Sequence, residues 1–226
     1  VSSWLNARRL ALLGVAGGFL ALPLLSLGSN QHGLIFAFML LLSLTSVVVA
    51  WQRRWNFLVP VSVIGTVLAQ AAWLVSWFSP ARLEEVVAAS LTWNALYLGA
   101  FFLFAHRRRE DQGVVLSALG LPFVSLALGW FLISHPTVRV PIEAILALTL
   151  GASACVLAVV WARPDLRHMQ TATSAGGYVL LGFWAALHLE RTNAGAALVC
   201  GAAFVLAQFA SPFVLRWRSF RPRASA

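Results

Sequence analysis

The sequence predicts an all-α integral membrane protein with about eight transmembrane helices in four helical hairpins and with both termini in the cytoplasm. Three observations lead to this fold class. The first is composition, because 60% of the 226 residues are hydrophobic and only 10% are charged, whereas a soluble domain carries about 25% charged residues. The second is a series of apolar segments that are each long enough to cross a bilayer. The third is the distribution of the arginines among the connecting loops.

A helix needs about 20 mostly apolar residues to cross the hydrocarbon core. Eight segments satisfy this requirement: Leu10–Leu27, Gly33–Trp51, Phe57–Phe78, Val86–Ala105, Val114–Ile133, Pro141–Trp161, about Met169–Leu189, and Ala194–Leu215. The seventh segment is the weakest, because residues 170–174 make its first turn polar. The apolar runs do not alternate with polar residues as strands of a membrane barrel do, so we expect helices. We also expect a single polytopic domain over residues 1–226.

The formal net charge of +9 raises the question of nucleic-acid binding, since basic patches bind phosphate. The positions of the charges argue against this class of partner. All sixteen basic residues are arginines, and thirteen of them lie at the termini and in every second loop, at positions 8, 9, 53, 54, 107, 108, 109, 163, 167, 216, 218, 221 and 223. Only Arg82, Arg139 and Arg191 lie in the alternate loops. This asymmetry is typical of the positive-inside rule and predicts a multi-pass protein of the bacterial inner membrane with cytoplasmic termini.

The even-numbered segments end alike. Trp51, His106, Trp161 and Trp217 each precede an arginine within one or two residues, at separations of 55, 55 and 56 residues. This spacing indicates hairpin repeats near residues 10–51, 57–105, 114–161 and 169–215. The alternative is that two spans and two short loops occupy about this length in any case.

No ionisable residue lies near the middle of a predicted span, although such a residue would be the usual sign of an ion path or of catalysis within the membrane. The polar candidates within the spans are Gln70, Asn94 and Gln208. We expect these three side chains to form hydrogen bonds with neighbouring helices; binding of a ligand is the alternative. Pro23, Pro122 and Pro212 would kink their helices or end them early.

A second group of polar residues falls at the predicted outer rim of the membrane: His135, Glu143, His188 and Glu190. Carboxylates beside imidazoles could perform acid–base chemistry or bind a metal. The alternative is that these residues are ordinary charges of loops that meet water. The sequence contains no HExxH, CxxC, GxGxxG or GxSxG motif. We therefore expect no catalytic residue, no metal site and no cofactor, and we do not expect an enzyme.

Three stretches carry a resemblance to a known family: GGFLALPLLSLGS (17–29), LIFAFMLLLSL (34–44) and RRWNFLVPVSVIGTVLAQAAWL (53–74). Over about residues 10–78 the chain resembles the large, multi-helix bacterial membrane proteins that are classified only as a domain of unknown function. The chain departs from the family pattern at Ala21 and Leu22, which separate the glycine-rich run from its proline, and at Phe38, where an aromatic hydroxyl is more usual. The resemblance implies an inner-membrane protein and no particular activity.

Three hypotheses of function follow. The first is a structural or accessory subunit of a membrane assembly, with membrane lipid and other membrane proteins as partners and no nucleic acid. The second is a transporter or a flippase-like protein for an apolar or lipid-linked substrate. The third is a membrane enzyme that acts at the outer rim through Glu143, His188 or Glu190.

Overall fold

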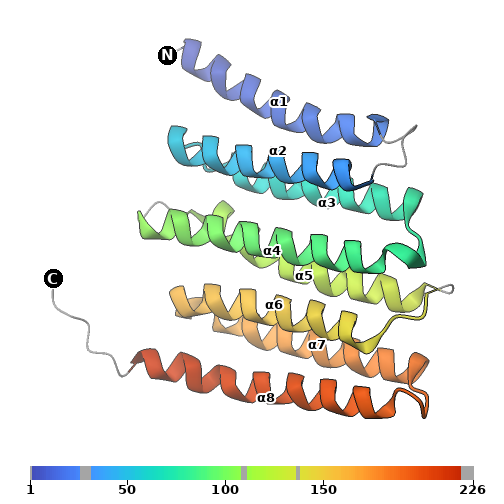
Figure 1. The fold of residues 1–226 in the computed structure, drawn as a ribbon. Helices are drawn as coiled ribbons and strands as arrows, with labels where there is room; N and C mark the ends of the chain where they lie inside the picture. The colour runs from blue at the N-terminus through green and yellow to red at the C-terminus, as the bar shows by residue number, and fades with distance from the viewer. Residues whose placement is uncertain (1, 26–31, 108–110, 136–137, 220–226) are drawn as a thin grey trace. The chain divides into compact units, whose positions relative to one another are not determined.

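A computed structural model describes residues 2–25, 32–107, 111–135 and 138–219. The predicted end of the first span at Leu27, the loop arginines Arg108 and Arg109, and the tail arginines Arg221 and Arg223 lie outside these ranges. All regular structure within the described ranges is helical, which confirms the all-α class. The α-helices are α1 (Ser2–Leu25), α2 (His32–Arg53), α3 (Leu58–Trp77), α4 (Leu83–His106), α5 (Gln112–Ser134), α6 (Ile142–Ala162), α7 (Arg167–His188) and α8 (Ala194–Ser219) (Figure 1).

Six of these helices are long and apolar enough to cross a membrane: those at Gly33–Arg53, Leu58–Trp77, Pro80–His106, Gln112–Ser134, Ile142–Ala162 and Ala194–Phe213. The chain is therefore a membrane protein with several spans by length and composition. Neither α1 nor α7 reaches the same standard among the described residues. The first third of α7 contains the polar residues that made the seventh segment the weakest one in the sequence.

The residues form two compact units. Unit 1 comprises residues 1–82 and 95–121, and unit 2 comprises residues 83–94 and 122–226. In unit 1, α1 contacts both α2 and α3, and α2 packs on α3. In unit 2, α6 contacts both α7 and α8.

Two glycines show why helices within a unit approach so closely. A Cβ atom added to Gly65 of α3 would lie 2.5 Å from the Phe19 ring of α1. In unit 2, a Cβ on Gly177 of α7 would lie 2.5 Å from the ring of Phe204, which is fully buried on α8. Small residues allow this kind of contact between membrane helices, because no side chain keeps the two backbones apart.

The turn between α2 and α3 has the geometry of a Schellman motif. The Trp55 N–H donates to the Ala50 carbonyl at 3.0 Å, and Arg54 has a φ of 60°. This left-handed position is usually filled by glycine. At the same end of unit 1, the Arg107 guanidinium lies over the Trp51 ring, 4.5 Å from its centroid. The C-terminal ends of α2 and α4 therefore lie together.

The two prolines inside long helices do not end them. Helix α5 continues past Pro122, and α8 continues past Pro212. Helix α1 ends at Leu25, close to Pro23. Of the two predicted effects, a kink or an early end, the early end is therefore wrong for Pro122 and Pro212.

Candidate functional site

Among the residues that the structure describes, polar side chains of the helices form three hydrogen-bonded clusters, each within one unit. In unit 1, the Ser62 hydroxyl lies 2.7 Å from the Tyr97 hydroxyl, which also lies 3.5 Å from the Thr66 hydroxyl. The Thr66 hydroxyl in turn lies 3.1 Å from that of Ser43. All four side chains are buried. This first cluster ties α2, α3 and α4 together without any charged group.

The second cluster joins α4 to α5 in unit 2. The Asn94 amide Nδ2 donates to the Ser125 hydroxyl at 2.6 Å and to the Ser90 carbonyl at 3.1 Å. The hydroxyls of Ser90 and Ser125 lie 2.8 Å apart. Asn94 Oδ1 is buried without a hydrogen-bond partner among the described residues.

The third cluster is centred on Gln208 of α8. Its Nε2 donates to Ser153 of α6 at 2.9 Å, and its Oε1 accepts from Ser174 of α7 at 2.5 Å and from Gln170 Nε2 at 3.4 Å. One glutamine side chain therefore bonds to both neighbouring helices of unit 2. By contrast, the half-buried Gln70 of α3 forms no hydrogen bond to another described side chain.

Sequence reasoning singled out Asn94 and Gln208 but not the serines and threonines that bond to them. A signal for these residues was present in the sequence. Each cluster contains two polar residues four positions apart on one helix, namely Ser62 and Thr66, Ser90 and Asn94, and Gln170 and Ser174. Residues four apart lie on the same helix face, so such a pair within an apolar span presents a polar stripe to a neighbouring helix.

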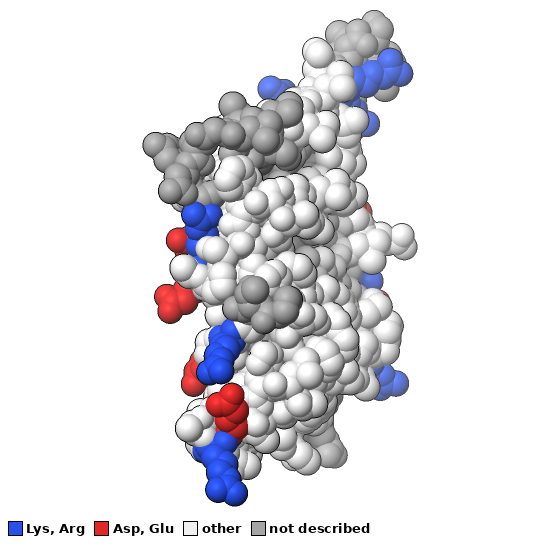
Figure 2. Space-filling view, turned by 90° about the vertical axis from the view of Figure 1, so that its right-hand side faces the viewer, with Lys and Arg blue, Asp and Glu red and all other residues white. Residues whose placement is uncertain are grey.

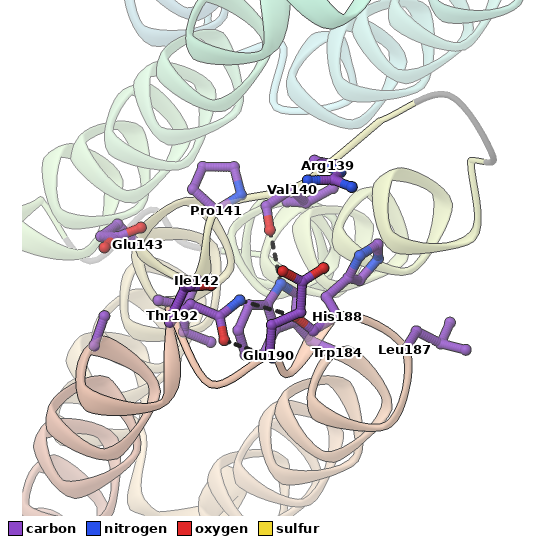
Figure 3. A pocket seen from close by; sticks show the side chains of 12 residues that line it. Arg139, Val140, Pro141, Ile142, Glu143, Trp184, Leu187, His188, Glu190 and Thr192 are labelled. Atoms are coloured by element: carbon purple, nitrogen blue, oxygen red, sulfur yellow. Dashed lines mark hydrogen bonds between the residues drawn. The ribbon is translucent and has the colours of Figure 1, made fainter.

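Most of the residues that were predicted to lie at the outer rim surround a hollow of about 470 Å³ in unit 2. Three of the four residues predicted for the rim line it: Glu143, His188 and Glu190. Arg139 contributes a cation, while His135 is not among the lining residues. The hollow is formed by the segment before α6, the first turn of α6, the end of α7 and the first turn of α8 (Figure 3).

The structure shows no pairing between the described charged groups that line the hollow. Arg139, Glu143 and Glu190 are exposed, and no ion pair joins them in the part of the chain that the structure describes. Figure 3 shows the side chains of Glu190 and His188 on one side of the hollow and that of Glu143 across it, beyond Pro141. The His188 Nε2 lies 3.3 Å from the Ile133 carbonyl. Among the described residues no three His, Cys, Asp or Glu side chains are placed to hold a metal ion.

The hollow is built around Trp184 and Asn193. Trp184, which is 2% exposed, donates its indole N–H to the Val140 carbonyl at 2.8 Å. Asn193 donates its Nδ2 to the His188 carbonyl and accepts the Glu190 N–H at its Oδ1, both at 2.8 Å. The Trp184 bond holds α7 against the segment before α6, and the Asn193 bonds hold the connection between α7 and α8 in place.

A second, apolar groove of about 310 Å³ lies next to the hollow and shares Ile142 and Trp184 with it. Its walls are formed by α7 and α8, and its lining includes Gly182 and Gly201. A Cβ atom at either glycine would meet no other atom within 4 Å. The two glycines therefore leave open space in the groove.

At the opposite end of α6, the charges pair with each other. Arg163 donates to both carboxylate oxygens of Asp165 at 3.1 Å, and this hydrogen bonding lowers the pKa of the exposed Asp165. Such an exposed pair contributes little stability, because solvent screens it. It is consistent with a solvated turn.

The fold and the polar clusters define an α-helical membrane protein. A family model described as "Predicted membrane protein (DUF2339)" matches residues 1–220, so the chain belongs to this family of predicted membrane proteins of unknown function. The family match extends well beyond the 10–78 stretch in which the resemblance was visible. The comparison with curated proteins and with solved structures gave no match.

Proposed function

We propose that this chain crosses the bacterial inner membrane eight times, with both termini in the cytoplasm, and that it is a structural or accessory subunit of a membrane assembly. The single observation that carries the subunit role is that the polar side chains inside the helices form hydrogen bonds mainly with one another. The amide and hydroxyl groups of the three clusters bond mainly to one another, as Gln208 does with Ser153 and Ser174. Such bonds hold helices together, and they leave few polar groups for a substrate path.

The orientation is supported by charge and by local contacts. Thirteen of the sixteen arginines lie on one predicted side, as the positive-inside rule requires. The contact between Trp51 and Arg107 brings two of the arginine-bearing helix ends together in unit 1. Figure 2 looks along the helices onto one end of them, where both acidic and basic side chains stand out from an otherwise uncharged surface.

A crossing by α7 is supported by the partners of its polar residues. In the membrane, an amide without a hydrogen-bond partner costs several kcal/mol. Gln170 Nε2 and the hydroxyls of Thr173 and Ser174 have partners within unit 2, whereas Gln170 Oε1 is buried without one among the described residues. Most of the polar groups in the first third of α7 are therefore satisfied, which supports a place for α7 at membrane depth.

The outward face of α8 supports a role in assembly. Leu198, Val199, Leu206, Phe209 and Phe213 are each at least two-thirds exposed. Large apolar surfaces of this kind contact lipid or other proteins. A second candidate function, a flippase-like protein for a lipid-linked substrate, is favoured by the apolar groove beside the polar hollow.

The test is purification of the chain from its native membrane in mild detergent, followed by mass spectrometry of the intact assembly. We expect other membrane proteins in fixed stoichiometry with the chain. Recovery of the chain alone or as a homo-oligomer would contradict the subunit role and would make transport assays with lipid-linked substrates the next measurement. A matched purification of an unrelated eight-helix protein from the same membranes controls for proteins that adhere to any apolar surface.

A further inference from the structure

The hollow and the groove of unit 2 have complementary chemistry. The hollow is lined by Arg139, Glu143, His188 and Glu190, whereas the groove is lined almost entirely by apolar and small residues. They share Ile142 and Trp184 and therefore lie side by side. A ligand that fills both must have a polar, charged end and an apolar chain.

Two helix N-termini border the hollow. Helix α6 begins at Ile142 after Pro141 with no side-chain cap. Asn193, which precedes α8, uses its side chain on His188 and Glu190 instead of on the first turn of α8. Ile142 and Ala196, in the first turns of these helices, line the hollow. Uncapped first-turn N–H groups attract phosphate, and Arg139 adds a guanidinium.

The carboxylates limit which anion can bind. Glu143 and Glu190 also line the hollow, and neither is paired with Arg139 among the described residues. A headgroup with a net negative charge would be repelled by these two carboxylates. A headgroup that carries a phosphate and an amine would instead place its phosphate near Arg139 and its ammonium near a glutamate.

We propose that this site binds one phospholipid with a zwitterionic, amine-bearing headgroup of the phosphoethanolamine type. The phosphate lies between Arg139 and the first turn of α8, the ammonium faces Glu190, and one acyl chain follows the groove past Gly182 and Gly201. This inference goes beyond the subunit role, since a bound lipid at this site is compatible with any assembly.

The experiment is lipid titration of the purified full chain, followed by native mass spectrometry. The probes are phosphatidylethanolamine and phosphatidylglycerol with the same acyl chains. We expect one molecule of phosphatidylethanolamine per chain, bound roughly tenfold more tightly than phosphatidylglycerol, as the loss of a charge-assisted contact would predict. Equal retention of the two lipids would overturn the proposal.

Two variants test the headgroup site. Glu190→Gln removes the carboxylate but keeps the backbone bond to Asn193, so it should weaken phosphatidylethanolamine binding by roughly tenfold. Glu190→Lys should reverse the preference toward phosphatidylglycerol. An unchanged preference in both variants would contradict the assigned role of Glu190.

The groove is tested by Gly201→Leu, which places a side chain in its open space. Gly99→Leu is the matched control, because Gly99 lies on α4 in unit 1 and its added Cβ would also meet nothing within 4 Å. We expect Gly201→Leu to lose bound lipid and Gly99→Leu to retain it. Equal retention in the two variants would overturn the proposal. Tight binding of soluble glycerophosphoethanolamine would also overturn the proposal. The same holds if the Gly201→Leu variant loses a bound protein instead of a bound lipid.

Discussion

Gln208 of α8 donates its Nε2 to the Ser153 hydroxyl of α6 at 2.9 Å, and the same side chain accepts the Ser174 hydroxyl of α7 at its Oε1. One amide therefore joins three consecutive helices. This relationship organises unit 2 and leads to the first prediction.

Replacing Gln208 with Leu should lower the free energy of unfolding by about 1–2 kcal/mol. The variant introduces an apolar side chain of similar size and removes one partner each from Ser153 and Ser174. Interhelical hydrogen bonds in membranes contribute about 0.6 and at most about 1.7 kcal/mol each. The measurement is thermal unfolding in detergent. Gln70→Leu is the control, because Gln70 forms no hydrogen bond to another described side chain. Equal losses of stability in both variants would show that the hydrogen bonds of Gln208 do not stabilise unit 2.

Gly177→Ala should destabilise unit 2 by about 1–3 kcal/mol, the usual cost of overpacking. The added Cβ would lie 2.5 Å from the buried Phe204 ring, so α7 and α8 would have to separate. Gly182→Ala on the same helix meets nothing within 4 Å and should be neutral or slightly stabilising, since alanine favours helix more than glycine. The difference between their unfolding temperatures checks the close contact. A smaller loss for Gly177→Ala than for Gly182→Ala would refute it.

Arg54→Gly should raise the free energy of unfolding by about 1 kcal/mol. Arg54 has a φ of 60°, and a residue with a Cβ pays roughly 1–2 kcal/mol in that conformation whereas glycine does not. Arg53→Gly removes an arginine from the same turn but at a helical position, so it should instead lower stability by about 0.5–1 kcal/mol. Chemical denaturation of the pair gives the test, and a destabilised Arg54→Gly variant would argue that the Arg54 side chain has a binding role.

A crossing by α7 can be tested by single-cysteine labelling. With Cys155 and Cys200 replaced by alanine, His168→Cys and Thr192→Cys place one thiol at each end of α7, where both native residues are exposed. A membrane-impermeant maleimide should label Thr192→Cys in intact cells and His168→Cys only after permeabilisation. Labelling of both from one side would mean that α7 does not cross, and labelling of His168→Cys alone in intact cells would reverse the orientation.

The outer-rim prediction shows how far a sequence can identify a site. Glu143, His188 and Glu190 were recognisable because charged residues are rare in this chain and stand at the ends of apolar runs. The sequence could not show that Glu143 and Glu190, which are 47 positions apart, line one hollow. Nor could it show the apolar groove, because small residues such as Gly182 and Gly201 appear in every membrane helix. Only the packing of α7 against α8 leaves the space beside them open.

The amino-acid sequence by itself determined the all-helical membrane class and the approximate helix bounds. The physical reason is that lipid imposes the same two requirements on every span, an apolar surface and internal satisfaction of the backbone, and both can be read from local composition. The tertiary structure decided which polar groups meet, since Ser43, Thr66 and Tyr97, or Ser153 and Gln208, are brought together only by helix packing. It also decided that Pro122 and Pro212 lie within continuous helices, and that a polar hollow borders an apolar groove. These features depend on contacts between segments far apart in the chain, which local patterns do not encode.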